Sequence, residues 1–259
     1  MAGAAAGFFV SIGSGLPDIS SNIAPDASSR IYDAKGRLIT TVHAEENRIP
    51  VSIDEVPVNL QNAFVAAEDV RFYEHHGVDP RGILRAAFSN IVSGNATGQG
   101  GSTITQQLAR NAFLNQEQTL KRKILEVILA LKIERQYTKK QILELYMNQI
   151  YFGQGCYGIE TASRVYFGKN AKDLTLPQAA LIAGLPNSPN YYSPFRSLEA
   201  AKYRQGIVLD QMAKYGYITE ADAAAAKEAD LHLAKPQDKK GTSSTASYFV
   251  NEVIRQISE

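Results

Sequence analysis

The stretch TLKRKILEVILALKIERQYTKKQILELYMNQIYFG (Thr119–Gly153) predicts two consecutive helices. Thr119 suits the N-cap of the first, which runs to about Gln136, because a threonine oxygen accepts a hydrogen bond from the first helical turn. Thr138 and Gln141 then form a capping box, and this opens a second helix ending near Gly153. The apolar residues that we expect on one face of the first helix are Leu120, Ile124, Val127, Ile128 and Leu131.

The surrounding sequence is also mostly helical in pattern. Pro57 suits the first turn of a helix with apolar residues at Leu60 and Phe64. Further helices are predicted at Arg81–Ile91, Thr105–Phe113, Pro177–Ala183, Ser197–Tyr215 and Thr219–Ala229. At Ser29–Val42, aromatic and β-branched residues flank a turn at Ala34–Gly36, which predicts two short strands. The expected fold class is therefore mainly α, with a short β-hairpin near the N-terminus.

The composition limits the classes of function. A chain of 259 residues can bury one substantial core, or a core plus a small appendage. Its 27 Lys and Arg against 26 Asp and Glu leave a net charge of +1. Nucleic-acid binders usually carry a large basic excess, so we expect no nucleic-acid partner. The single cysteine, Cys156, excludes an intrachain disulfide and a Cys-rich metal site, and we interpret it as a small packing residue.

The two ends of the chain differ from its middle. Ala2–Gly13 is weakly apolar and uncharged, but a membrane-spanning helix needs about 20 such residues. The segment is either the outer end of an anchor helix or an unstructured start rich in small residues. Lys235–Ser247 has the polar composition of a linker, and Tyr248–Ile257 resumes an apolar pattern.

Glu68 and Asp69 are the first candidates for chemistry. Both fall at the end of the helix that Pro57 opens, where the helix macrodipole disfavours another negative charge. Two phenylalanines lie nearby in sequence, and such surroundings raise the pKa of a carboxyl, as a general base or acid requires. The alternative is that both carboxylates form surface ion pairs with Arg71 or Arg81.

The adjacent histidines His75 and His76 are interpreted as structural. They point in different directions and cannot form a helical metal pair, and no cysteine cluster lies near to complete a zinc site. We expect a histidine here to hydrogen-bond a backbone group of the loop that follows Glu68.

The second candidate stretch is GGSTITQQLARN (Gly100–Asn111), in which two glycines lead into a helix N-terminus. Free N–H groups at such a terminus bind anions such as phosphate. Gln106, Gln107 and Asn111 add neutral donors suited to sugar hydroxyls or amides. The alternative is an ordinary glycine loop followed by a capping box between Thr103 and Gln106.

In the third stretch, Thr119–Glu134, Arg122 and Lys123 precede Glu126 by four and three residues, so all three share one helix face. They form either routine helix ion pairs, each worth about 0.3–0.5 kcal/mol, or a cationic site for a diphosphate leaving group. Position alone leaves both interpretations open.

Together, these stretches resemble the family 51 glycosyltransferases, which are the transglycosylase domains of class A penicillin-binding proteins and their monofunctional relatives. The resemblance covers about Ser29 to Ala229. Its motifs are E-D-x-x-F-x-x-H-x-G at Glu68–Gly77, G-G-S-T-I-T-Q-Q at Gly100–Gln107, R-K-x-x-E at Arg122–Glu126, the runs at Ile142–Ser163 and Tyr166–Lys169, and LTLPQAALIAGLPNSPNYYSP at Leu174–Pro194.

The resemblance implies a helical, lysozyme-like domain with a small, mobile jaw that dips into the membrane. The implied substrate is lipid II, a disaccharide-pentapeptide on undecaprenyl diphosphate. By motif position, Glu68 resembles the general base that deprotonates the acceptor sugar's 4-hydroxyl. That oxygen attacks the anomeric carbon of the growing chain, inverts it to a β-1,4 linkage and expels the lipid diphosphate. Glu126 resembles the second essential carboxylate, and the glycine-rich stretch Ser93–Gly101 suits a flap that opens for a long glycan.

The resemblance also implies a set of substrate-binding positions. They are Asp69, Phe72, His75, Ser102, Thr103, Gln106, Gln107, Arg110, Asn111, Arg122 and Lys123. The three cations among them would neutralise the diphosphate, while Asp69 and His75 would hold the Glu68 loop in shape. No tightly bound cofactor is expected. A divalent cation, Mg²⁺ or Mn²⁺, is left open as an aid at the diphosphate, although no ligand set is legible.

Two positions depart from the pattern of many relatives. Arg110 stands where many have Lys, which keeps the charge but changes its reach. Gln118 stands where many have Arg, so fewer cations would surround the diphosphate. Arg122 and Lys121 would then have to neutralise more of the diphosphate charge.

The resemblance suggests three segments: residues 1–28 as the remnant of a membrane anchor, 29–234 as the glycosyltransferase domain, and 235–259 as a linker toward an absent transpeptidase domain. No S-x-x-K motif for acylation by β-lactams occurs. The implied location is the outer face of the bacterial cytoplasmic membrane. The implied partners are lipid II, the growing glycan, the membrane surface and other cell-wall synthesis proteins.

Two other functions compete with this interpretation. A lysozyme-like hydrolase or lytic transglycosylase also uses a glutamic acid, but it has no diphosphate to bind and would not need the second and third motifs. A non-catalytic cell-wall scaffold is the other rival. Both carboxylates are present, and Gln118 is its only support.

Overall fold

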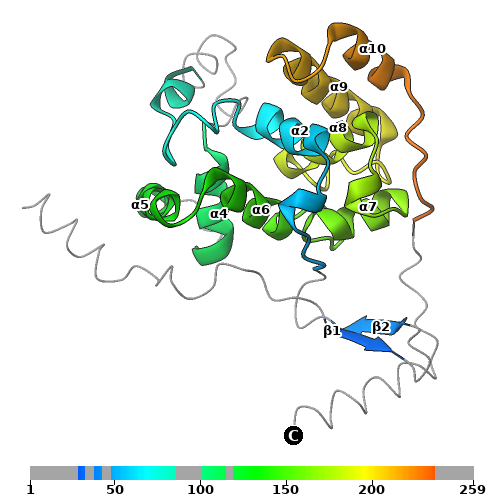
Figure 1. Cartoon of the computed structure of the whole chain (residues 1–259), viewed down its shortest axis with the longest axis horizontal. Helices are drawn as coiled ribbons and strands as arrows, with labels where there is room; N and C mark the ends of the chain where they lie inside the picture. Colours follow the sequence, from blue (N-terminus) through cyan, green and yellow to red (C-terminus); the bar gives the residue numbers. More distant parts are fainter. Residues whose placement is uncertain (1–28, 33–37, 43–47, 86–100, 115–118, 237–259) are drawn as a thin grey trace, which may run out of the picture.

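The computed structural model describes residues 29–32, 38–42, 48–85, 101–114 and 119–236. This part of the chain is mainly helical, as the sequence predicts (Figure 1). The helices are α2 (Val58–Glu68), α4 (Ile104–Phe113), α5 (Leu120–Gln136), α6 (Lys139–Gln149), α7 (Ile159–Phe167), α8 (Leu176–Gly184), α9 (Leu198–Lys214) and α10 (Glu220–Glu228). Shorter 3-10 turns lie at η1 (Ile53–Glu55), η2 (Ala171–Asp173) and η3 (Leu185–Asn187), and residues 80–85 are also helical.

Two strands, β1 (Ser29–Tyr32) and β2 (Leu38–Val42), pair antiparallel beside the helical body (Figure 1). Ser29 lies opposite Val42, and the register shifts between Ile31 and Tyr32. Both strands fall inside the range for which the sequence predicts a hairpin. The predicted turn lies outside the described residues.

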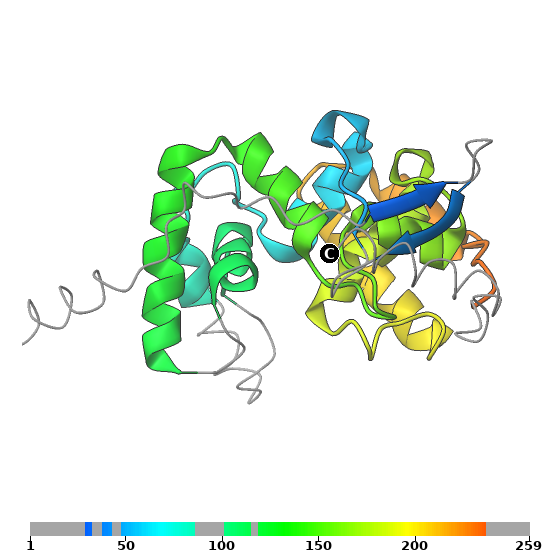
Figure 2. The same cartoon turned by 90° about the horizontal axis from the view of Figure 1, so that it is seen from below.

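The helices form two groups, which Figure 2 shows from below the view of Figure 1. In one group α4 packs against α5 and α6, and in the other α2, α8 and α9 pack together, with α10 against α9. Phe64 of α2 joins the groups, because its ring meets Tyr146 of α6 edge-on with centroids 6.1 Å apart. Cys156 is buried, as expected of a packing residue. The C-terminal end of α2 therefore lies where the groups meet.

Capping by threonine begins several helices where the sequence predicts. Thr103 and Gln106 form a reciprocal capping box at α4, and Thr138 and Gln141 do so at α6. The Thr119 side chain accepts a hydrogen bond from the N–H of Arg122 at α5. These contacts confirm the predicted starts of three helices.

Two boundaries differ from the sequence prediction. Helix α6 ends at Gln149 instead of near Gly153, because Ile150 already adopts an extended conformation with φ of -66° and ψ of 147°. Helix α7 was not predicted, since its N-cap is Gly158, which provides no side-chain cap. The local signals for this helix are Gly158 and Gly168 at its ends, with φ of 80° and 66°, and Glu160 in its first turn with Arg164 in its last.

The buried face of α5 is also not the predicted one. Leu120 is 80% exposed and Leu131 is 41% exposed. The residues that α5 buries are Glu126, Leu129, Ala130 and Ile133. Apolar residues occupy several sides of this helix, so their spacing does not select a face. The face that packs against α4 carries Glu126 inward, where two cations compensate its charge.

Several predictions fall outside the described residues. They concern the anchor remnant before Ser29, the glycine-rich loop up to residue 100, Gln118 and the linker after residue 236. The division into a head and a mobile jaw also stays a prediction. Across the described ranges, no helix has both the length and the apolar character needed to cross a membrane.

Gly77 provides a test of how the loop after α2 packs on α5. Its φ is +88°, and an added Cβ would lie 2.9 Å from the carbonyl oxygen of Ala130. We expect Gly77→Ala to lower the free energy of unfolding by about 2–4 kcal/mol, from left-handed strain plus overlap. Urea unfolding would measure it. Gly155→Ala is the control, because Gly155 has φ +77° but nothing within 4 Å of an added Cβ. Equal losses in both variants would contradict the packing argument.

Candidate active site

A cavity of about 440 Å³ opens where α2, α4 and α9 meet. The loop after α8 completes its wall. Its polar lining consists of Glu68, Asp69, Arg85, Ser102, Gln107, Arg110, Asn187, Arg204, Gln211, Lys214 and Tyr215. Four of the predicted residues besides Glu68 are in this set, and they come from segments far apart in the sequence.

Glu68, the last residue of α2, lines this cavity. Its Oε2 accepts a hydrogen bond from Gln107 Nε2 at 2.8 Å. Its Oε1 is buried and has no hydrogen-bond partner among the described residues. Desolvation by burial raises the pKa of Glu68, while Gln107 and the positive charges of Arg204 and Arg110 oppose that rise only in part. The carboxyl is therefore a stronger proton acceptor than an ordinary glutamate.

Asp69 pins the loop after α2 to the start of α4. Its Oδ2 accepts a hydrogen bond from the backbone N–H of Ile104 at 3.0 Å and lies 2.9 Å from His75 Nε2. Thr103 adds a second link by donating its hydroxyl to the carbonyl of Gly77 at 2.7 Å. The expectation that Asp69 and His75 hold the Glu68 loop in shape agrees with this geometry. The prediction that a histidine hydrogen-bonds a backbone group of this loop is wrong for His75, because its ring nitrogen contacts the Asp69 carboxylate instead.

The alternative of surface ion pairs for Glu68 and Asp69 is also wrong. Asp69 is buried, and Arg71 pairs with Asp79 at 2.6 Å. No ion pair joins Arg81 to either carboxylate in the described part of the chain.

The N-terminus of α4 is filled by the protein itself. The N–H of Ile104 donates a hydrogen bond to the Asp69 carboxylate, and the N–H of Thr103 donates one to the Gln106 side chain. Thr103 in turn accepts the N–H of Gln106. These donors are not free to bind phosphate, so the predicted anion site at this terminus gives way to the capping-box alternative.

Glu126 forms a buried ionic cluster behind Ser102. Its carboxylate is 1% exposed and lies 3.0 Å from an Arg122 terminal nitrogen and 2.8 Å from Lys123 Nζ. Lys123 also donates to Ser102 Oγ at 2.8 Å, and Ser102 lines the cavity. Burying an unpaired carboxylate is strongly unfavourable, so these cations are required by Glu126 itself. Lys123 connects the cluster to the cavity.

Seven predicted substrate-binding residues do not line this cavity: His75, Thr103, Arg122 and Lys123, whose contacts are given above, and three more. Phe72 is fully buried and packs against Tyr73 and His75. Gln106 is 1% exposed and serves in the capping box. Asn111 is exposed on α4 but is not part of the cavity lining. We therefore assign packing and capping contacts to Phe72 and Gln106 instead of substrate contacts.

Sequence reasoning missed the contribution of α9. Arg204, Gln211 and Lys214 line the cavity opposite Glu68. Their spacing of seven and three residues places them on one helix face, beside the buried Val208. This polar stripe along a predicted helix was the signal available in the sequence.

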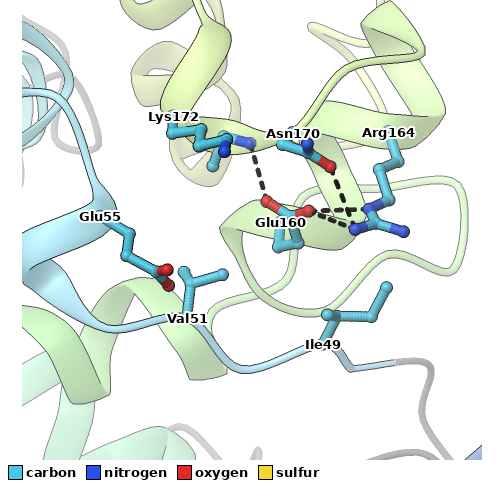
Figure 3. Close-up of a pocket in the computed structure, with 8 residues that line it drawn as sticks. Ile49, Val51, Glu55, Glu160, Arg164, Asn170 and Lys172 are labelled. Carbon is cyan, nitrogen blue, oxygen red and sulfur yellow. Dashed lines mark hydrogen bonds and ion pairs between the residues drawn. The ribbon is translucent and has the colours of Figure 1, made fainter.

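A second cavity, of about 230 Å³, lies beside α7 (Figure 3). Its buried carboxylate, Glu160, pairs with Arg164 at 2.7 Å and accepts the N–H of Ala171 at 2.7 Å. Arg164 also donates to Asn170. Because both Glu160 oxygens have partners, this cluster ties α7 to the loop after it and offers no reactive group.

The donors present do not fit a resident metal. Within the described ranges, no three His, Cys, Asp or Glu side chains gather where they could hold an ion. Asp69 and Glu126 are already engaged by a histidine, a backbone N–H and two cations.

A comparison with family models matches residues 35–213 to the family described as Transglycosylase. The match covers more than half of the chain. The chain therefore belongs to the transglycosylase family.

Curated relatives place this domain among class A penicillin-binding proteins. The chain is 47% identical over 248 residues to penicillin-binding protein 1A of Aquifex aeolicus, covering 95% of the chain and 33% of the relative. It is 49% identical over 221 residues to penicillin-binding protein 1A of Escherichia coli, covering 85% and 26%. The chain thus spans about a quarter to a third of these relatives. Together, family and relatives support peptidoglycan glycosyltransferase activity.

A solved structure agrees with the fold. The crystal structure of penicillin-binding protein 1A from Haemophilus influenzae matches with a TM-score of 0.50 and 25% identity. The match covers 90% of this chain and 25% of that one. It supports the helical architecture described above.

The raised pKa of Glu68 predicts a pH-dependent effect of Glu68→Gln on stability. Unfolded, Glu68 titrates near the ordinary value of 4.5, and folding raises this pKa. Between the two values the folded protein holds the proton more tightly, so wild-type stability falls as pH rises. We expect Glu68→Gln to be more stable than wild type at pH 7, with the difference shrinking toward pH 4. Thermal unfolding across this range would measure it. A difference that does not depend on pH would contradict the burial argument, and the exposed Glu199→Gln controls for loss of one charge.

Proposed function

We propose that the chain polymerises lipid II into β-1,4-linked glycan strands and releases undecaprenyl diphosphate. The observation that carries this proposal is the Glu68 carboxyl of raised pKa in a cavity lined by cations. Polymerisation needs one base and one positively charged cradle. Both are present within the same cavity.

In the proposed reaction, Glu68 accepts the proton of the acceptor sugar's 4-hydroxyl. The oxygen forms a bond to the anomeric carbon of the growing chain while the bond to the lipid diphosphate breaks, which inverts that carbon. Glu68 becomes neutral and the diphosphate leaves as an anion. The raised pKa favours the proton transfer, since a base works best when its pKa lies near the working pH.

Positive charge on two sides supports departure of the diphosphate. Arg110 of α4 and Arg204 of α9 line the cavity, and neither forms an ion pair with a carboxylate in the described residues. Lys123 reaches the cavity through Ser102 while it remains paired with Glu126. Fixed cations where negative charge develops lower the barrier without reorganising. The proposed role of Glu126 is to hold Arg122 and Lys123 in place.

This set of cations also separates the proposal from its rivals. A glycan hydrolase has no departing diphosphate and needs no such cluster around its acid. A scaffold without turnover has no need for a desolvated carboxyl in the wall of a cavity. The proposed location remains the outer face of the bacterial membrane, where lipid II and the growing strand are the partners.

The proposal is tested by glycan-chain formation from labelled lipid II in detergent. Glu68→Gln removes the base, and we expect the rate to fall at least about 100-fold. Glu126→Gln leaves Arg122 and Lys123 without their carboxylate, and we expect a loss of similar size. The control is Glu199→Gln, on the exposed start of α9, which should polymerise at the wild-type rate. Wild-type protein that degrades finished peptidoglycan but makes no polymer would establish the hydrolase.

Exposed apolar side chains suit the proposed membrane contact. Leu84, in the helical residues 80–85, is 72% exposed, and Leu120, the first residue of α5, is 80% exposed. We expect the double change Leu84→Ser and Leu120→Ser to reduce co-sedimentation with phosphatidylglycerol-containing vesicles. Leu198→Ser, at a 48% exposed position on α9, is the control. Equal co-sedimentation of both variants would contradict a membrane role for Leu84 and Leu120.

A further inference from the structure

A buried chain of hydrogen bonds leads to Glu68 from the far side of α4. The Tyr146 hydroxyl on α6 donates to Gln107 Oε1 at 3.3 Å, and Gln107 Nε2 donates to Glu68 Oε2 at 2.8 Å. Tyr146 is fully buried, with its ring held edge-on by Phe64. Three helices thus contribute one residue each to a single line of donors ending on the carboxylate.

The direction of this chain matters because an amide has one donating and one accepting end of nearly equal shape. With Nε2 toward Glu68, Gln107 favours the ionised carboxylate. With Oε1 toward Glu68, it would favour the protonated acid. A tyrosine hydroxyl that donates to Oε1 satisfies the accepting end, and successive donors polarise one another toward the negative charge.

Tyr146 is suited to remain a donor throughout the working pH range. Burial raises the pKa of its hydroxyl well above the ordinary value, and the negative charges of Glu68 and Asp69 raise it further. The hydroxyl therefore keeps its proton. It does not take part in proton transfer, and its effect passes through Gln107.

We propose that Tyr146 is a positioning residue for the reaction, holding the Gln107 amide so that its N–H group steadies the Glu68 carboxylate in one orientation. This inference rests on the proposed function for its catalytic meaning. The hydrogen-bond chain itself can be tested without substrate.

Other charged groups face Glu68 and stay unchanged when only the Tyr146 hydroxyl is removed. They are Asp69, which follows α2, Arg110 on α4 and Arg204 on α9. Tyr146→Phe keeps the ring against Phe64 and deletes a single oxygen. Any shift in Glu68 titration in this variant therefore comes from the hydrogen-bond chain.

The test is the pH profile of kcat/KM for lipid II polymerisation by Tyr146→Phe. Loss of the donor weakens support for the ionised base, so the acidic limb moves to higher pH. We expect the rate on that limb to fall about 3- to 10-fold and to recover toward wild type at alkaline pH, with KM little changed. In a Gln107→Leu background, Tyr146→Phe should move the limb no further.

The matched control is Tyr166→Phe. Tyr166 is also fully buried, but its hydroxyl donates to the carbonyl of Phe152, away from Glu68. This variant should keep the wild-type acidic limb. A Tyr146→Phe profile lowered equally at every pH would overturn the proposal, as would an undiminished shift in the Gln107→Leu background.

A second readout separates this inference from the proposed function. The stability difference between Tyr146→Phe and Tyr146→Phe/Glu68→Gln, followed across pH, reports Glu68 titration in substrate-free protein. We expect this titration at higher pH than in the pair with Tyr146 intact. If the protein makes no polymer, the proposed function fails while this shift still tests the chain. An unshifted titration would overturn the inference even in an active enzyme.

Discussion

The structure of the site depends on burying the Glu68 carboxyl where two groups of helices meet. Helix α2 brings this carboxyl to its C-terminal end, and burial raises its pKa. A desolvated carboxylate is unfavourable unless donors and cations surround it. The surrounding elements provide them: α4 supplies Gln107 and Arg110, and α9 supplies Arg204. Asp69 makes this arrangement rigid by fastening the same loop to the first N–H of α4.

The cations near the cavity form two groups: one is paired with a buried carboxylate, and the other lines the cavity. Arg122 and Lys123 are tied to Glu126, whose buried charge they compensate. Arg110 and Arg204 have no ion pair with a carboxylate in the described parts of the chain, and they tune Glu68 from the cavity wall. A diphosphate entering the cavity would therefore meet the second group directly. The diphosphate would contact the Glu126-paired cations only through Lys123, which donates a hydrogen bond to Ser102 in the cavity wall. Charge compensation by cations of α5 would thus be separate from the proposed diphosphate binding by cations of α4 and α9.

The helices with threonine caps could be predicted from the sequence, and the motifs that begin at Glu68, Gly100 and Arg122 could be recognised in it. Helix caps and motifs both consist of residues that lie close together in the chain. Predictions failed where the partner comes from elsewhere in the chain. Helix α5 has apolar residues on several sides, and only its packing against α4 selects the face that carries Glu126. From the sequence, the N-terminus of α4 was predicted to bind an anion. In the fold, Asp69 already accepts a hydrogen bond from the first N–H group of this helix, that of Ile104. The polar face of α9 can be recognised in its own segment, but Arg204 was missed because nothing there indicates that this face lines the same cavity as Glu68.

Titration of Glu68 itself shows whether burial holds this carboxyl as a base of raised pKa. Protein labelled with ¹³C at glutamate side chains, titrated by NMR and compared with Glu68→Gln, would identify the Glu68 carboxyl signal. We expect this signal to titrate above the ordinary value of 4.5 and to be missing from the variant. A Glu68 signal that titrates at or below that value would contradict the account, because burial would then not govern the carboxyl on which the proposed reaction depends.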